Sequence, residues 1–271
     1  MKLKRKLELK EAPHWFHSNS SKTLIWKAAL SLLPIVGLFV FFDFKTMLGN
    51  WLLSLAAGFG FEYASRKLFG SKPLYSDGDI FYIGTTLALL LPKPVDVAAV
   101  LNAAFFSFVI GRFAFGGRGE AVFHAIPLGI LGFGLWPVDT NTQNLLSSHA
   151  SWPVLLAMAA SAALFFHTKI LDWRMALIFS VTSILTILIS GRSLSLLQLT
   201  ILMYVSVWVL SDSAKPMSQP GRVLFSGFSG VLSGLFYLKL NLIDAAAASL
   251  LCANLFLAQA DKFFLPRRTS S

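Results

Sequence analysis

Cysteine is scarce in this sequence, and so are the usual motifs of soluble enzymes. The chain of 271 residues has one cysteine, Cys252, so it can form neither an internal disulfide nor a thiolate metal cluster. It contains no C-x-x-C, Walker or G-x-S-x-G sequence, and no pair of histidines or carboxylates at metal-ligand spacing. We therefore expect no independent soluble-type active site, no catalytic residue and no metal ligand.

Charged residues are also few, at 13% of the chain, whereas 55% of the residues are hydrophobic. This balance lies outside the range of soluble globular proteins and indicates a polytopic membrane protein. Residues 1–22 are basic but lack the compact apolar core and the cleavage site of a signal peptide. We expect them to form a cytoplasmic N-terminal segment that the protein keeps.

Ten apolar stretches have about the length that a membrane-spanning helix needs. The third ends at Pro92 and the fifth contains Pro127, so these two are interrupted. The predicted fold class is an all-α polytopic membrane protein, with one transmembrane domain over residues 23–260 and a cytoplasmic tail over 261–271. The predicted spans are 24–43, 48–65, 80–92, 98–115, 121–137, 151–168, 173–190, 194–210, 222–238 and 241–258.

Lysine and arginine are distributed unevenly between the two sides that these spans define. If the N-terminus is inside, Lys27 lies in the first span and 18 of the 23 basic residues lie on the inner side. The outer side holds Lys45, Lys93, Arg192 and Lys239. Because basic residues near span ends stay cytoplasmic, we expect a multi-pass protein of the bacterial plasma membrane with both termini inside. The net charge of +10 favours anionic lipid headgroups as partners. Nucleic acid is not expected, because the basic residues form no single face.

An internal repeat is present at an offset of 122 residues. The identities at this spacing are Trp51 with Trp173, Tyr82 with Tyr204, and Lys93-Pro94 with Lys215-Pro216. The halves, about 24–137 and 151–260, would each hold five spans, and an odd number makes the second half enter the membrane from the opposite side. Such inverted repeats place binding sites between the halves.

The third span is the first candidate binding element. It follows S-D-G-D, contains Gly84-Thr85-Thr86 and stops at L-P-K-P. Irregular backbone at membrane depth is tolerated only where protein or a cavity satisfies it, so Thr85 and Thr86 could line a cavity for a planar polar ligand or an ion. Alternatively, both hydroxyls bond back to their own helix, and spacing alone favours this second interpretation.

Four stretches resemble one known family. Residues 111–129, GRFAFGGRGEAVFHAIPLG, are similar to its G-K-x-x-F-G-G-x-G-x-N-P-F-N-P segment. SDGDIFYIGTTLALLLP and SDSAKPMSQPGRVLFSGFSGVL resemble its S-D-G-x-x-x-x-T-G and T-D-P-x-x-S-P segments, and Asp244, Asn254 and Asp261 with KFFLPRR keep the spacing of its ending. The chain is identified as a divergent member of the NqrB/RnfD family, whose members belong to the sodium-pumping NADH:quinone reductase and to the Rnf electron-transport complex.

The resemblance implies a membrane subunit that holds flavin, either FMN or riboflavin, and passes electrons across the bilayer with other redox subunits. In some relatives this transfer is coupled to sodium or proton movement. In the family one FMN is usually esterified to the threonine of an S-G-A-T motif after the fifth span. Residues 136–153 here read WPVDTNTQNLLSSHASWP, without that motif, and Thr140 and Thr142 are the acceptor candidates. We therefore expect no covalent FMN, and noncovalent binding of any flavin.

The glycine-rich stretch leaves two interpretations open. Its glycines let the cytoplasmic link between the fourth and fifth spans turn tightly, with Arg112 and Arg118 at headgroup level. Alternatively, its amides and arginines meet a phosphate or an isoalloxazine edge. The predicted cofactor-binding set is Gly84, Thr85, Thr86, Gly116, Gly117 and Arg118. Other ionisable groups, for which pairing or snorkelling near a span end suffices, are Glu62, His124, His167 and Asp244.

Three functions stay open. The first is a flavin-carrying membrane subunit of an oxidoreductase complex, with or without coupling to cation translocation. The second is a small-solute transporter or channel, because five-plus-five inverted repeats also build such proteins. The third is a membrane accessory protein similar to the NqrB-like proteins associated with enediyne biosynthesis. A flavin absorption spectrum separates the first from the other two.

Overall fold

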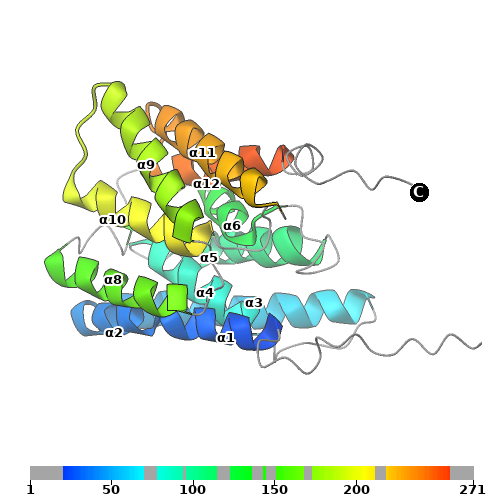
Figure 1. The fold of residues 1–271 in the computed structure, drawn as a ribbon. Coiled ribbons are helices and arrows are strands. Elements are labelled where there is room, and N and C mark those ends of the chain that lie inside the picture. The colour runs from blue at the N-terminus through cyan, green and yellow to red at the C-terminus, as the bar shows by residue number, and fades with distance from the viewer. Residues whose placement is uncertain are drawn as a thin grey trace, which may run out of the picture.

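The computed structural model describes residues 21–69, 78–93, 96–114, 123–135, 143–144, 151–167, 173–210 and 218–256. Almost all of these residues are helical (Figure 1). The first half contains α1 (Ser21–Ser31), α2 (Leu33–Phe42), α3 (Phe44–Phe69), α4 (Asp79–Leu90), α5 (Val97–Ala104), the π-helix η3 (Phe105–Phe113) and α6 (Ala125–Gly134). The second half contains α8 (Trp152–His167), α9 (Trp173–Ile189), α10 (Leu196–Tyr204), the π-helix η4 (Val205–Val209), α11 (Gln219–Phe236) and α12 (Leu242–Leu255).

Each of the ten predicted spans corresponds to one of these helical segments. The first span consists of α1 and α2, the fourth of α5 and η3, and the eighth of α10 and η4. The third span stops at Leu90, just before the predicted break at Pro92. The predicted fold class, an all-α polytopic membrane protein, is confirmed.

Two short strands join loops that were both predicted to lie outside. Strand β1 (Pro92–Lys93) pairs antiparallel with β2 (Gln143–Asn144), with Pro92 opposite Asn144. The pairing brings the loop after the third span beside the loop after the fifth, as expected if both lie on the same side of the membrane.

Local sequence signals explain several helix boundaries. Pro34 lies at the start of α2, a position where its missing N–H costs nothing, and separates α2 from α1. Ser195 and Gln198 form a capping box at the start of α10. The side chain of Asn241 accepts a hydrogen bond from the Asp244 backbone N–H and caps α12.

The helices differ in how well each one alone could cross a bilayer. Within the described residues, Thr23–Phe42 is the segment both long and apolar enough to do so, with a mean hydropathy of 2.1. Seven other apolar helices have 10–17 residues each. The remaining long helix of the first half, α3, has 26 residues but carries Glu62, Arg66 and Lys67.

Helices in equivalent positions of the two halves make similar contacts. In the first half α3 packs against α4, α5 and η3, and η3 packs against α6; in the second, α9 packs against η4 and α11, and α11 against α12. Between the halves, α8 lies along α1 and α2, and α12 lies along α6 (Figure 1). These are contacts between the first and sixth spans and between the fifth and tenth. A pseudo-two-fold axis produces this arrangement, so it supports the inverted repeat, which stays a prediction.

The tightest helix pair, α9 with α11, depends on small residues. A Cβ atom at Gly230 would collide with the Thr182 hydroxyl and would lie 2.7 Å from the Phe179 carbonyl oxygen. The Ser183 hydroxyl donates a 3.0 Å hydrogen bond to the Gly230 carbonyl. Close backbone approach with side-chain hydrogen bonding is typical of helix pairs in membranes.

Candidate functional site

Helix α4, which carries three of the predicted cofactor-binding residues, lies in the interior of the first half. It contacts α1, α3 and α6, and all its residues except Phe81 are buried. A Cβ atom at Gly84 would lie 3.0 Å from the Leu55 side chain and 3.6 Å from the Leu55 backbone nitrogen. Gly84 therefore lets α4 lie close against α3.

The hydroxyls of Thr85 and Thr86 both have partners within the protein. The Trp51 indole N–H donates a 2.9 Å hydrogen bond to the Thr85 hydroxyl. The Thr86 hydroxyl donates a 2.8 Å bond to the Tyr82 carbonyl one turn earlier. Thr86 thus makes the back-bond that spacing favours, whereas Thr85 joins α4 to α3. A ligand at Thr85 would therefore lie beside Trp51, and the Thr85 hydroxyl could still donate its own proton.

Other polar atoms in the same region are buried and available. Asn50 and Ser54 lie one turn apart on α3, and both residues are fully buried. The Asn50 amide nitrogen bonds to the Ala88 carbonyl at 3.4 Å, which places Asn50 beside α4. Among the residues that the structure describes, the Asn50 Oδ1, the Ser54 hydroxyl and the Tyr204 hydroxyl have no hydrogen-bond partner. Buried polar atoms normally have one, so these three are candidates to contact a ligand.

Helix α4 meets the second half of the chain through aromatic residues. The Tyr82 hydroxyl donates a 2.5 Å hydrogen bond to the Trp208 carbonyl in η4. Tyr204 and Trp208 stack with their ring centroids 5.0 Å apart. Tyr204 also interacts with the Thr86 side chain, although without a hydrogen bond of good geometry. The third and eighth spans, equivalent in the predicted repeat, are therefore in contact.

A buried ionic network lies at the predicted cytoplasmic ends of α3, α4 and η3. The Arg112 guanidinium lies 2.8 Å from the Asp79 carboxylate and 3.7 Å from that of Glu62. Arg66 lies 2.8 Å from the other oxygen of Glu62, one helical turn away. Glu62 is fully buried, and Asp79 and Arg112 are nearly so. Among the described residues, the network brings two carboxylates together with two guanidinium groups.

The network adds one feature that the sequence analysis did not include. Arg112 points into the protein, where it is buried against Asp79 at the predicted cytoplasmic end of η3. Its position in η3 is relevant, since π-helical turns occur frequently at functional sites. Glu62 is paired, as expected, but inside the protein rather than at its surface.

His124 joins the fifth and tenth spans. It is fully buried just before α6, and its Nδ1 lies 3.0 Å from the Asn254 Oδ1 in α12. Its ring stacks on Phe225 of α11 at a centroid distance of 6.0 Å. His124 thus contacts two helices of the other half. His167 is exposed at the end of α8.

The other predicted site residues cannot be placed. Gly116, Gly117, Arg118, Thr140 and Thr142 lie outside the described residues. Across the described part of the chain, no three histidine, cysteine or acidic side chains are grouped so that they could hold a metal ion.

Comparison with known proteins agrees with the family resemblance found in the sequence. Residues 8–138 match the NQR2, RnfD, RnfE family. A protein of Methanosarcina acetivorans, named as the D-subunit of an ion-translocating oxidoreductase complex, is 27% identical over 260 residues, which are 89% of this chain and 90% of that protein. The sequence resemblance to NqrB and RnfD proteins is thereby confirmed.

A second relative matches over a shorter stretch. It is the D-subunit of the proton-translocating ferredoxin:NAD(+) oxidoreductase complex of Clostridium ljungdahlii, with 25% identity over 142 residues. This alignment covers 52% of the chain and 43% of that relative.

Proposed function

We propose that this chain is the membrane subunit of a multi-subunit electron-transport complex that couples electron transfer to ion translocation. The observation that carries the proposal is the near full-length match to a protein named as the D-subunit of an ion-translocating oxidoreductase complex. Because the sequence has a single cysteine, it cannot ligate an iron–sulfur cluster alone, and electrons must reach it from partner subunits.

The region where the two halves of the chain meet is the place at which we expect a ligand to bind. The third and eighth spans meet through Tyr82, Tyr204 and Trp208. In inverted-repeat proteins the contact between the two halves is where ligands and coupling ions bind.

Noncovalent flavin is the cofactor that we propose for this interior. Flavin supplies one-electron and two-electron redox chemistry when bound, and the protein supplies burial and hydrogen bonds. The buried Asn50 Oδ1, Ser54 hydroxyl and Tyr204 hydroxyl are the candidates to hydrogen-bond the flavin. Thr85 is a further candidate, because its hydroxyl accepts from Trp51 and can still donate its own proton.

Affinity purification in mild detergent followed by an absorption spectrum tests the proposal. We expect a flavin spectrum and co-purification of redox subunits from the native host. Replacing Thr85 and Thr86 together by valine should weaken flavin retention at nearly constant volume. Thr186→Val is the matched control, because Thr186 makes the same kind of back-bond, to Thr182, in α9. A colourless protein that captures no redox partner would overturn the proposal and favour a transporter or accessory role.

A further inference from the structure

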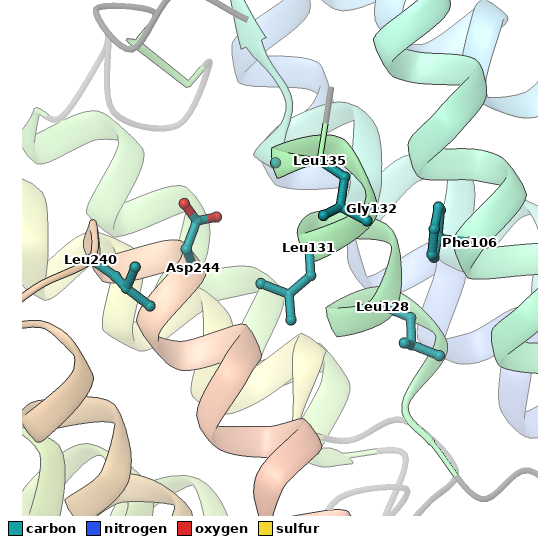
Figure 2. Close-up of a pocket in the computed structure, with 8 residues that line it drawn as sticks. Phe106, Leu128, Leu131, Gly132, Leu135, Leu240 and Asp244 are labelled. Carbon is teal, nitrogen blue, oxygen red and sulfur yellow. The ribbon is translucent and has the colours of Figure 1, made fainter. Parts of the chain in front are cut away.

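A cavity of about 430 Å³ opens at the predicted outer end of the contact between α6 and α12. Figure 2 shows Leu131 of α6 and Leu135, which directly follows α6, on one side of it and Leu240 and Asp244 on the other. The complete lining consists of Phe106, Leu128, Leu131, Gly132, Gly134, Leu135, Leu240 and Asp244. All of these residues are apolar except Asp244, so the cavity combines an apolar wall with one carboxylate.

The Asp244 carboxylate has capacity for a further hydrogen bond. Its Oδ2 accepts a 2.5 Å bond from the Asn241 amide, and its backbone N–H donates to the Asn241 Oδ1 at 3.0 Å. In the described part of the chain, no group donates to its Oδ1. A carboxylate beside apolar surface is stabilised by a donor, above all by a cation.

Two cations lie on the outer surface close to this cavity in the sequence and in the fold. Lys239 is exposed and directly precedes Leu240, which lines the cavity. Arg192 donates hydrogen bonds to the carbonyl oxygens of Tyr237 at 3.2 Å and Leu238 at 3.1 Å, in the same turn between α11 and α12. The carboxylate of Asp244 therefore lines the cavity, and the side chains of Lys239 and Arg192 lie at the turn beyond its predicted outer end.

We propose that this cavity binds a phospholipid with a primary ammonium headgroup, phosphatidylethanolamine, from the outer leaflet. An acyl chain lies against the leucines, the ammonium pairs with Asp244, and the phosphate lies toward Lys239. A free metal cation or a soluble amine would make no use of the leucine wall, and the carboxylate disfavours an anionic headgroup. The proposal is independent of the proposed function, because the cavity includes no residue of α4.

Lipid spin labels test the proposal on the full chain reconstituted in phosphatidylcholine vesicles. We expect a larger immobilised fraction for labelled phosphatidylethanolamine than for labelled phosphatidylcholine, whose trimethylammonium has no N–H. A partly exposed ion pair corresponds to a preference of up to about fivefold. Asp244→Asn should abolish the preference. Asp96→Asn is the matched control: Asp96 also lies at an outer helix start, where it accepts from the Ala98 N–H, but it lines no part of this cavity.

A second variant tests the apolar wall. Leu131→Trp fills the cavity and should lower the immobilised fraction of both lipids, with unchanged helicity by circular dichroism. Equal fractions for the two lipids in the wild type, or equal losses from Asp244→Asn and Asp96→Asn, would overturn the proposal. It would also be overturned if Leu131→Trp released a flavin chromophore and left lipid binding intact, because the cavity would then be a cofactor site.

Discussion

The Tyr82 hydroxyl in α4 donates a hydrogen bond to the Trp208 carbonyl in η4, across the boundary between the two halves of the chain. An offset of 122 residues relates Tyr82 to Tyr204 and Thr86 to Trp208. Tyr204 in turn interacts with Thr86. The contact of Tyr82 with Trp208 and the contact of Tyr204 with Thr86 are therefore the same contact, exchanged between the two halves. This reciprocity is what a two-fold relationship between the halves produces.

Tyr82→Phe should lower the stability of the protein more than Tyr204→Phe. The first change removes the donor to a buried carbonyl, at a cost of about 1–3 kcal/mol, whereas Tyr204 makes no hydrogen bond of good geometry. Thermal unfolding in detergent measures the difference, and Tyr63→Phe, at an exposed position of α3, is the control. The same unfolding temperature for Tyr82→Phe and Tyr63→Phe would contradict this expectation.

Arg112→Gln should destabilise the protein by about 3–5 kcal/mol, because it removes the guanidinium that lies 2.8 Å from the buried Asp79 carboxylate. Adding Asp79→Asn to this variant should restore part of the stability, since the uncompensated charge is removed. Arg174→Gln serves as the control, because Arg174 is exposed and lies over the Trp173 ring at 5.8 Å. If the double variant were less stable than Arg112→Gln, the pairing would not be the source of the effect.

Gly230→Ala should cost about 1–3 kcal/mol through overpacking, because the new methyl group would meet Thr182 and the Phe179 carbonyl. Gly227→Ala, one turn earlier on α11, should be tolerated, since its nearest contact would be Ile178 at 3.7 Å. Unfolding curves of the two variants provide the comparison. Equal unfolding midpoints for the two variants would show that α9 and α11 can move apart without loss of stability.

Membrane topology can be tested with single cysteines in a Cys252→Ser background. The charge asymmetry predicts that Arg118→Cys is cytoplasmic and that Asn144→Cys is outside. An impermeant thiol reagent applied to intact cells should therefore modify position 144 and spare position 118. The reverse pattern would show that the orientation is wrong.

The denatured protein should carry no covalent FMN, because the S-G-A-T sequence is absent from residues 136–153. In-gel fluorescence and intact mass measure this directly. A fluorescent band with the added mass of FMN that disappears in Thr140→Ala or Thr142→Ala would identify the acceptor and contradict the expectation.

The fold could be predicted from the sequence because its signals are local. Apolar runs gave the ten spans, and Pro92 marked the end of the third, since each feature acts on adjacent residues. The π-helices η3 and η4 could not be predicted, because they depend on packing against other helices and not on a local sequence signal.

The buried ionic network could not be predicted in the same way. Glu62, Asp79 and Arg112 are far apart in the sequence, and each one alone resembles a charge at a span end. The four-residue spacing of Glu62 and Arg66 is the one local signal from which a pair of this network could have been predicted. The contact with Arg112 depends on how α3, α4 and η3 pack together, which a single sequence does not reveal.

The ionic network also makes the two halves mechanically unequal. At the offset of 122 residues, the counterparts of Glu62 and Asp79 are Ile184 and Ile201. From residue 100 the repeat shifts by one, so that Gly111 matches Gly234 and the counterpart of Arg112 is Leu235. Ion pairs therefore brace one end of the first half, whereas the corresponding positions of the second half carry no charge. Apolar side chains can slide past one another with little change in free energy, but buried ion pairs cannot. If the halves move during turnover, we expect the first half to stay rigid and the second half to deform.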